Sequence, residues 1–184
     1  NGKFSLVRMF RDSLNLVKDE LNNDGFVRYV NGEITVVPDS MAIRYSNSVN
    51  SVHYFSVLPY GLKDEAVNLK YLDSVNIKGN KYHKIQVSFD QEGGGVDYED
   101  IFIYWINTKT NHIDYLGYTY YTDDGGMRFR EAYNPRVING IRFADYRNYK
   151  PKDSTLLFSK IDSAFENDEL ELLSTVDLEN ISVN

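Results

Sequence analysis

Histidine is the side chain that most often acts as a general base or a metal ligand near neutral pH, and this 184-residue chain has three. None of His53, His83 and His112 lies in a His-Glu-x-x-His or His-x-His pattern, spacings that bring two ligands to one metal ion. His53 lies near the end of a helical pattern, so we predict that it contacts a ligand. We predict structural roles for His83, at the edge of the core, and for His112, in a turn.

The acidic residues form no recognisable metal-binding motif. Asp97, Glu99 and Asp100 follow the run Gly93–Gly95, and carboxylate oxygens bind calcium, but their spacing matches no EF-hand loop. We therefore predict a solvated turn and no metal site. Neither Lys-Ser/Thr nor a helix start follows the glycines, so they predict a hairpin connection rather than a phosphate-binding loop.

Several enzyme classes are excluded by composition. The chain has no Cys, which excludes disulfides, thiolate catalysis and Cys-ligated metal, and it has no Gly-x-Ser-x-Gly nucleophile elbow. With 27 Asp and Glu residues, a hydrolase that uses a pair of carboxylates stays open as an alternative. We assign no catalytic residue and no cofactor.

Aromatic side chains gather in the middle of the chain. The runs 101–106 and 115–121 are apolar on both strand faces, which predicts strands covered on both sides. Such strands either belong to a filled core or line an apolar cavity in a curved sheet. On the second interpretation, the candidate ligand contacts are Tyr104, Trp105, Tyr118 and Tyr120.

Basic residues are concentrated in a chain whose net charge is −7. This charge argues against nucleic acid as a partner, because Lys and Arg contacts to phosphate supply most of that affinity. Residues 128–152 nevertheless hold seven basic and two acidic residues, with aromatic residues between them. Arg128 and Arg130 are therefore candidate contacts to an anionic ligand. The alternative is that this stretch pairs with the acidic segment 162–180 across neighbouring strands.

The patterning predicts a mainly β protein of a single domain, residues 1–184. Alternating apolar and polar residues, as in 84–89 and 169–179, indicate strands with one buried and one solvated face. Asn31-Gly32 and Asn139-Gly140 are type I′ hairpin signals, so the strands should pair antiparallel. Residues 40–57 form one amphipathic helix, because Met41, Tyr45, Val49 and Val52 recur at helical spacing until Pro59.

No stretch has the length and apolarity of a membrane span, and the first residues do not form a signal peptide. Because a strand pattern begins at Phe4, we expect that the native chain starts earlier. Any membrane attachment would then depend on an anchor in that earlier segment.

Three motifs resemble a known family: the segments 104–109, 126–130 and 137–143, which read YWINTK, GMRFR and VINGIRF. They are similar to uncharacterised Bacteroidota-type envelope lipoproteins, and their order resembles the lipoprotein-localisation (LolA/LolB-like) fold. The resemblance implies a curved, open antiparallel half-barrel wrapped round one helix, with an apolar cavity, in an exported periplasmic or outer-membrane protein. It carries over no functional residues.

Some of these relatives carry the label deoxyribose-phosphate aldolase, and the sequence argues against that activity here. A Schiff-base aldolase of that kind needs a desolvated Lys in a (β/α)₈ barrel of roughly 250 residues. Alternating strands joined by Asn-Gly turns do not supply eight crossover helices.

Taken with the resemblance, these patterns predict a non-catalytic envelope module that binds a lipid or another hydrophobic ligand between its sheet and the helix 40–57. The alternatives are the hydrolase, with carboxylates and a His in the same cleft, and a structural or interaction protein whose core is filled by its own side chains. The oligomeric state is not predicted.

Overall fold

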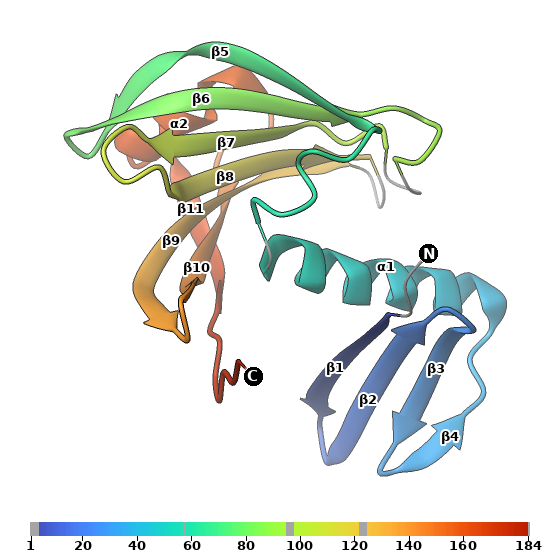
Figure 1. Cartoon of the computed structure of the whole chain (residues 1–184). Coiled ribbons are helices and arrows are strands. Elements are labelled where there is room, and N and C mark those ends of the chain that lie inside the picture. Colours follow the sequence, from blue (N-terminus) through green and yellow to red (C-terminus); the bar gives the residue numbers. More distant parts are fainter. Residues whose placement is uncertain (1–3, 57, 95–97, 122–124, 184) are drawn as a thin grey trace. The chain divides into compact units, whose positions relative to one another are not determined.

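The computed structural model describes residues 4–56, 58–94, 98–121 and 125–183. The chain divides into two compact units, Asn1–Tyr60 and Gly61–Asn184, which we call the first and second unit (Figure 1). In the part of the chain that the structure describes, no helix has the length and apolarity to cross a membrane.

The first unit is a four-stranded antiparallel sheet with one helix. Its strands are β1 (Ser5–Asp12), β2 (Asn15–Asn22), β3 (Gly25–Val30) and β4 (Glu33–Thr35), in the order β1-β2-β3-β4. Asn31 and Gly32 both have positive φ, 52° and 90°, in the turn between β3 and β4. The predicted type I′ hairpin is confirmed, because that turn needs positive φ at both central residues.

The helix α1 (Asp39–Ser56) confirms the predicted amphipathic helix within one residue at each end. It packs on β1, β2 and β3 of its own unit. Val49 on the predicted apolar stripe is fully buried, whereas Ile43 on the same helix is 56% exposed. The side chain of Val52 lies outside the described part of the structure. Tertiary packing of this stripe holds a helix whose Asn and Ser content gives it poor intrinsic propensity.

A buried carboxylate links β1, β2 and β3. Asp19 on β2 is fully buried and lies 2.6 Å from Arg8 Nη2 and 2.7 Å from Arg28 Nε. Burial by itself raises the pKa of Asp19, but hydrogen bonds from Arg28 and Arg8 outweigh burial and hold the pKa below its ordinary value. Arg28 also lies over the ring of Tyr45 at 3.5 Å, which connects this cluster to α1.

The second unit is a seven-stranded antiparallel sheet. Its strands follow one another in space in chain order, β11-β10-β9-β8-β7-β6-β5, so β5 and β11 are its edges. The elements run in this order: β5 (Val67–Ile77), β6 (Asn80–Phe89), β7 (Phe102–Asn107), β8 (Ile113–Tyr120), β9 (Gly126–Ile138), β10 (Ile141–Pro151), η1 (Phe158–Lys160), α2 (Ile161–Glu166) and β11 (Leu170–Val176).

Short turns connect most of these strands. Asn139 and Gly140 have φ of 48° and 82° between β9 and β10, which confirms the second predicted type I′ turn. Lys78 and Gly79 have similar values, 47° and 77°, between β5 and β6. Gly93 and Gly94 lie in the connection from β6 to β7, as expected for a hairpin, and Gly95 lies outside the described residues.

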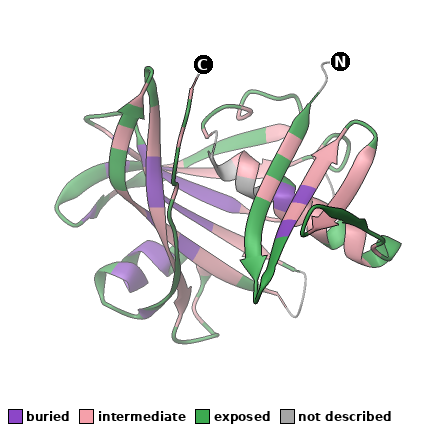
Figure 2. Cartoon of the chain, turned by 90° about the horizontal axis from the view of Figure 1, so that it is seen from below, coloured by how far each residue is buried: buried purple, intermediate pink, exposed green. Residues whose placement is uncertain are grey.

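The core of the second unit lies between the sheet and the short helix α2. Ile161, Ala164 and Phe165 of α2 pack against a cluster that includes Trp105 and Phe129. Figure 2 shows the buried residues, in purple, on the central strands of the larger sheet and on α2. We call the face of the sheet that α2 covers the α2 face. Strand β7 is buried on both faces, which confirms the prediction for residues 101–106.

The expectation that 84–89 has one solvated face is wrong at Lys84. Its side chain belongs to the α2 face and is only 5% exposed, because α2 covers that part of the sheet. The expected alternation in 169–179 also fails in part. β11 forms, but Leu172 is 50% exposed and Val176 is 37% exposed, because β11 is an edge strand.

The described residues therefore form a mainly β structure of two open antiparallel sheets and short helices, which confirms the predicted fold class at this level.

Candidate functional site

The second unit brings five of the predicted ligand contacts together on one face of its sheet. Residues directly opposite each other on antiparallel strands share a face. Phe102 pairs with Tyr118, and Tyr118 pairs with Arg128. Tyr104 pairs with Leu116, which pairs with Arg130. These residues and Tyr120 lie on the face opposite α2, which we call the aromatic face.

Rings touch one another across the strands of the aromatic face. Phe102 of β7 packs edge-to-face on Phe89 of β6 at 5.7 Å and stacks on Tyr118 of β8 at 5.6 Å. Tyr104 lies 6.3 Å from Phe102, and Tyr120 lies 6.3 Å from Tyr118. Aromatic pairs at these distances add stability beyond the area that they bury. The rings therefore form a continuous apolar surface over β6, β7 and β8.

The two candidate arginines border this surface on β9. The Arg128 guanidinium lies 4.9 Å from the centre of the Tyr120 ring, and the Arg130 guanidinium lies 5.5 Å from that of Tyr118. Arg130 Nη2 also donates to the Tyr118 hydroxyl at 3.3 Å. Both arginines are half-buried. The rings beside these two arginines thus come from β8, not from the aromatic residues that lie between the basic ones in the sequence.

Arg128 differs from the neighbouring basic residues in its partners. Its Nη1 donates to the Met127 carbonyl oxygen at 2.9 Å, and no carboxylate among the described residues pairs with it. A guanidinium has five N–H donors, and the hydrogen bonds of Arg128 to described residues use one of them.

Most of the other basic residues between 128 and 152 are neutralised. Arg136 pairs with Asp145 at 2.9 Å, and Arg147 pairs with Glu131 at 3.2 Å. Of the described ion pairs in this stretch, the one that reaches the segment 162–180 is Lys150 with Glu171, at 3.4 Å. The predicted alternative, pairing with the acidic segment, therefore holds for Lys150. Arg136 and Arg147 pair with acids inside the basic stretch. Arg142 pairs with Asp114 on β8.

Trp105 lies apart from this set, on the α2 face. Adjacent residues of a strand point to opposite faces, and its ring packs against Phe129 at 5.2 Å. Its Nε1 donates to Asp162 Oδ2 at 3.1 Å, and the side chain is fully buried. The structure therefore places Trp105 in the core beneath α2, on the opposite face of the sheet from Tyr104.

The three histidines lie at different places in the chain, on α1, on β6 and between β7 and β8. His53 lies on α1 in the first unit, where its Nε2 is 3.3 Å from the Val7 carbonyl oxygen. His83 Nδ1 lies 3.3 Å from Ser74 Oγ, and its ring packs edge-on against Tyr71. His112 is exposed in the connection between β7 and β8, as predicted. The hydrolase alternative stays a prediction.

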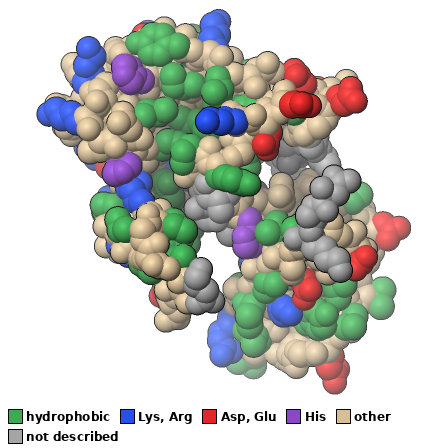
Figure 3. Space-filling model, viewed as in Figure 1, with side chains coloured by type: hydrophobic (Ala, Val, Ile, Leu, Met, Phe, Trp, Pro, Cys, Tyr) green, Lys and Arg blue, Asp and Glu red, His purple; other side chains and the backbone are tan. Residues whose placement is uncertain are grey.

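The aromatic face becomes exposed toward the β5 edge of the sheet. Leu69 is 54% exposed and Tyr71 is 57% exposed, and both pair with residues of β6 that lie on this face. Figure 3 shows hydrophobic side chains, in green, gathered over β5 and β6. By contrast, Tyr104 and Leu116 in the centre of the face are fully buried.

Comparison with known protein families shows which family the chain belongs to. A model described as a family of unknown function, DUF6503, matches residues 11–180. The chain belongs to this family. None of the curated proteins matches it, and no solved structure does. The predicted likeness to an uncharacterised family is confirmed, while the envelope and LolA-like parts of the resemblance stay predictions.

Sequence reasoning missed a buried carboxylate in this DUF6503 chain. Glu131 on the α2 face accepts from Lys78 Nζ at 2.6 Å, and from Arg147 Nη1 and the Tyr149 hydroxyl at 3.2 Å each. Burial alone raises the pKa of Glu131, but these hydrogen bonds outweigh it and lower the pKa below its ordinary value of 4.5. The signal in the sequence was a Glu opposite Arg147 across the Asn139-Gly140 hairpin.

Acid is expected to weaken the fold through Glu131. A carboxylate whose pKa is lowered by folding stabilises the native state above its ordinary pKa, and this stability is lost as pH falls through the folded pKa. Urea unfolding followed from pH 7 to pH 3 should show stability decreasing below about pH 4.5. Glu131→Gln should reduce this pH dependence, whereas the exposed Glu65→Gln should not. An unchanged slope in Glu131→Gln would contradict the assignment.

Metal ions are expected to leave the melting temperature unchanged. Among the described residues, no group of three or more His, Asp or Glu side chains is placed to hold a metal ion. Glu99 and Asp100 are described, but Asp97 lies outside the described residues, so the predicted turn needs a direct test. A bound ion would stabilise the native state by mass action. A dose-dependent rise with calcium, magnesium or zinc, abolished by Asn or Gln at these three positions, would overturn the prediction.

Proposed function

We propose that the chain is a non-catalytic binding module whose ligand has an apolar body and an anionic head, such as a fatty acid. The apolar body contacts the aromatic face at Tyr118 and Tyr120, and the head binds Arg128 and Arg130. The observation that carries this proposal is the half-buried Arg128, 4.9 Å from the Tyr120 ring and without a carboxylate partner among the described residues.

The energetics of the proposal follow from its two parts. Burying apolar surface contributes roughly 25 cal/mol per Å², so an acyl chain laid over the rings supplies most of the affinity. The arginines supply orientation, because a guanidinium binds a carboxylate or phosphate with two parallel hydrogen bonds. Tyr104 is fully buried, and on this proposal it supports the rings and touches the ligand only if the face opens.

The finer parts of the sequence prediction belong to the same proposal. We include an envelope location, periplasmic or outer-membrane, and a LolA-like half-barrel formed by the curved seven-stranded sheet. Fractionation of the native cells tests the location: recovery in the envelope supports it, and recovery with the cytoplasm contradicts it.

A second candidate function rests on a specific observation. Val87, Tyr104 and Leu116 on the aromatic face have no exposed surface. Their burial favours the alternative of a structural or interaction protein whose core is filled by its own side chains. The binding experiments below separate the two candidates.

Substitution of Arg128 is expected to weaken binding of a fluorescent fatty acid about tenfold or more, because a charge-assisted hydrogen bond contributes about 1.5–3 kcal/mol. Binding is measured with the purified chain, and a fatty alcohol of equal length serves as the uncharged probe. Arg128→Gln should weaken the acid selectively and leave the alcohol unchanged. The exposed Lys109→Gln, in the turn after β7, is the charge-matched control. Equal binding of both probes to the parent protein would contradict the role of the arginine.

Enlarged rings test whether the aromatic face has space for a ligand. Tyr118→Trp or Tyr120→Trp should weaken binding of the fatty acid with little loss of stability if a ligand space exists. In a filled core the same overpacking costs about 1–3 kcal/mol. Destabilised variants together with a parent protein that binds no fatty acid would support the filled core instead.

A further inference from the structure

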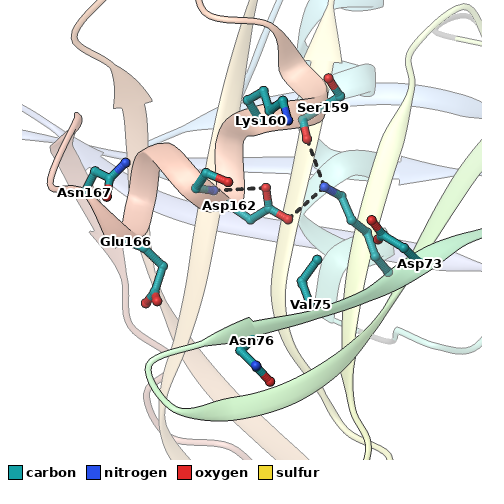
Figure 4. A pocket seen from close by; sticks show the side chains of 10 residues that line it. Asp73, Val75, Asn76, Ser159, Lys160, Asp162, Glu166 and Asn167 are labelled. Atoms are coloured by element: carbon teal, nitrogen blue, oxygen red, sulfur yellow. Dashed lines mark hydrogen bonds and ion pairs between the residues drawn. The ribbon is translucent and has the colours of Figure 1, made fainter.

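A cavity lies on the α2 face of the seven-stranded sheet. It has a volume of about 390 Å³ and opens between β5–β6 and the segment η1–α2, all within the second unit. Figure 4 shows Asp73, Val75 and Asn76 from β5 on one side and Lys160, Asp162, Glu166 and Asn167 from the η1–α2 segment on the other. The volume falls in the range of cavities that hold small molecules.

A buried ammonium group lines this cavity. Lys84 is 5% exposed, and its Nζ donates to Asp162 Oδ2 at 2.7 Å and to the Ser159 carbonyl oxygen at 2.9 Å. A Lys ammonium has three N–H donors. No third acceptor for Lys84 is present among the described residues, so one donor remains for a molecule in the cavity.

Asp162 holds this ammonium in place and already accepts three hydrogen bonds from groups of the protein. Its Oδ2 accepts from Lys84 and from Trp105 Nε1, and its Oδ1 accepts from the Ser163 backbone N–H at 3.0 Å. A charged group fixed by such a network has lost its side-chain freedom before a ligand arrives, which reduces the entropic cost of binding.

A β-bulge brings a carboxylate to the same cavity. The register of β5 with β6 shifts between Tyr71 and Asp73, so Tyr71 stays on the aromatic face while Asp73 lies opposite Lys84 on the α2 face. Bulges re-aim side chains in this way. The opposite wall supplies Glu166, whose Oε1 accepts from the Lys78 backbone N–H at 2.7 Å, which leaves Oε2 for other donors.

The composition of the walls selects a class of ligand. Three carboxylates and two ammonium groups line the cavity, so its net charge is −1 and it disfavours small anions. Val75 is its apolar residue, and the other lining groups are hydroxyls and amides. Such a wall offers many donors and acceptors and little surface for an acyl chain. It suits a neutral molecule rich in hydroxyl groups.

We propose that this cavity binds a saccharide of one or two rings. One sugar oxygen accepts the remaining N–H of Lys84, and sugar hydroxyls donate to the carboxylates of Asp73 and Glu166. This site is separate from the aromatic face and does not depend on the proposed binding of an apolar ligand there.

The test uses the whole chain and a panel of glucose, galactose, mannose, N-acetylglucosamine and maltose. Saturation-transfer NMR detects binding, and amide shifts of the ¹⁵N-labelled protein locate it. At least one sugar should bind saturably and shift amides of β5 and α2. Asp73→Asn and Glu166→Gln should each weaken that binding about tenfold, as expected for a hydrogen bond to a charged group. The exposed Glu65→Gln should bind as the parent does.

Three outcomes would overturn the proposal. One is that no sugar of the panel binds saturably. Another is that a sugar binds equally well to the parent, Asp73→Asn and Glu166→Gln, which would place it elsewhere. A third is that inorganic phosphate shifts the same amides more strongly than any sugar does. Parallel titration with the fatty acid distinguishes the two sites, since the acid should not displace the sugar.

Discussion

Replacing Lys84 by Met is expected to destabilise the second unit by about 3–5 kcal/mol, because the change leaves Asp162 as a buried charge without its cation. Lys84 and Asp162 are 5% exposed each, and their ion pair is 2.7 Å long. The pair connects β6 to α2, which carries Ile161 and Phe165 of the core. Loss of the cation therefore weakens the attachment of α2 to the sheet.

Urea unfolding followed by the emission of Trp105 measures this effect, since the indole N–H is bonded to Asp162. The double variant Lys84→Met with Asp162→Asn should regain much of the stability, because Asn offers an oxygen to Trp105 without a buried charge. The exposed Lys81→Met on the same strand is the control and should change stability by less than about 0.5 kcal/mol. A single variant as stable as the parent would contradict the assigned role of the pair.

Val49→Asp is expected to unfold the first unit or to destabilise it by more than about 4 kcal/mol. Val49 has no exposed surface, and α1 packs on β1, β2 and β3. An aspartate at this position loses its hydration without gaining a partner. Because the Asn and Ser residues of α1 give it poor intrinsic helix propensity, α1 should not survive the loss of its packing.

The matched control is Ile43→Asp, a similar change at a position of α1 that is 56% exposed. Far-ultraviolet circular dichroism and thermal melting should show a folded protein for Ile43→Asp and a large loss for Val49→Asp. If Val49→Asp melted within a degree or two of the parent, the burial of this stripe would be refuted.

The strands, the Asn-Gly turns and α1 could be predicted because their signals are local. A type I′ turn needs positive φ at both central residues, and Asn-Gly is a dipeptide that adopts this conformation readily. Asn31-Gly32 and Asn139-Gly140 both do so. Residues 101–106 are apolar on both strand faces, which is a property of the segment itself. Such features depend little on what the rest of the chain does.

The helix α2 was missed because its six residues are shorter than the window in which helical periodicity can be recognised. Ile161, Ala164 and Phe165 do follow helical spacing, which is the signal that was available. Without α2, the sequence could not show that Lys84 is buried. The bulge that moves Asp73 onto the α2 face is likewise fixed by pairing with β6 and not by the local sequence.

The ligand-contact set was partly accessible to sequence reasoning. Tyr118 and Tyr120 share a strand face by alternation, and so do Arg128 and Arg130, but the register of β8 with β9 decides that all four share one face. The sequence alone could have excluded Trp105 from this set. Tyr104 and Trp105 are adjacent, and adjacent residues of a regular strand point to opposite faces.

The most direct test of the proposed ligand site is amide chemical-shift mapping of the ¹⁵N-labelled chain during titration with a fatty acid. The proposal predicts saturable shifts centred on Tyr118, Tyr120, Arg128 and Arg130, which are lost in Arg128→Gln. Shifts centred on α2 and its core residues, or no saturable shift at all, would contradict a binding surface on the aromatic face.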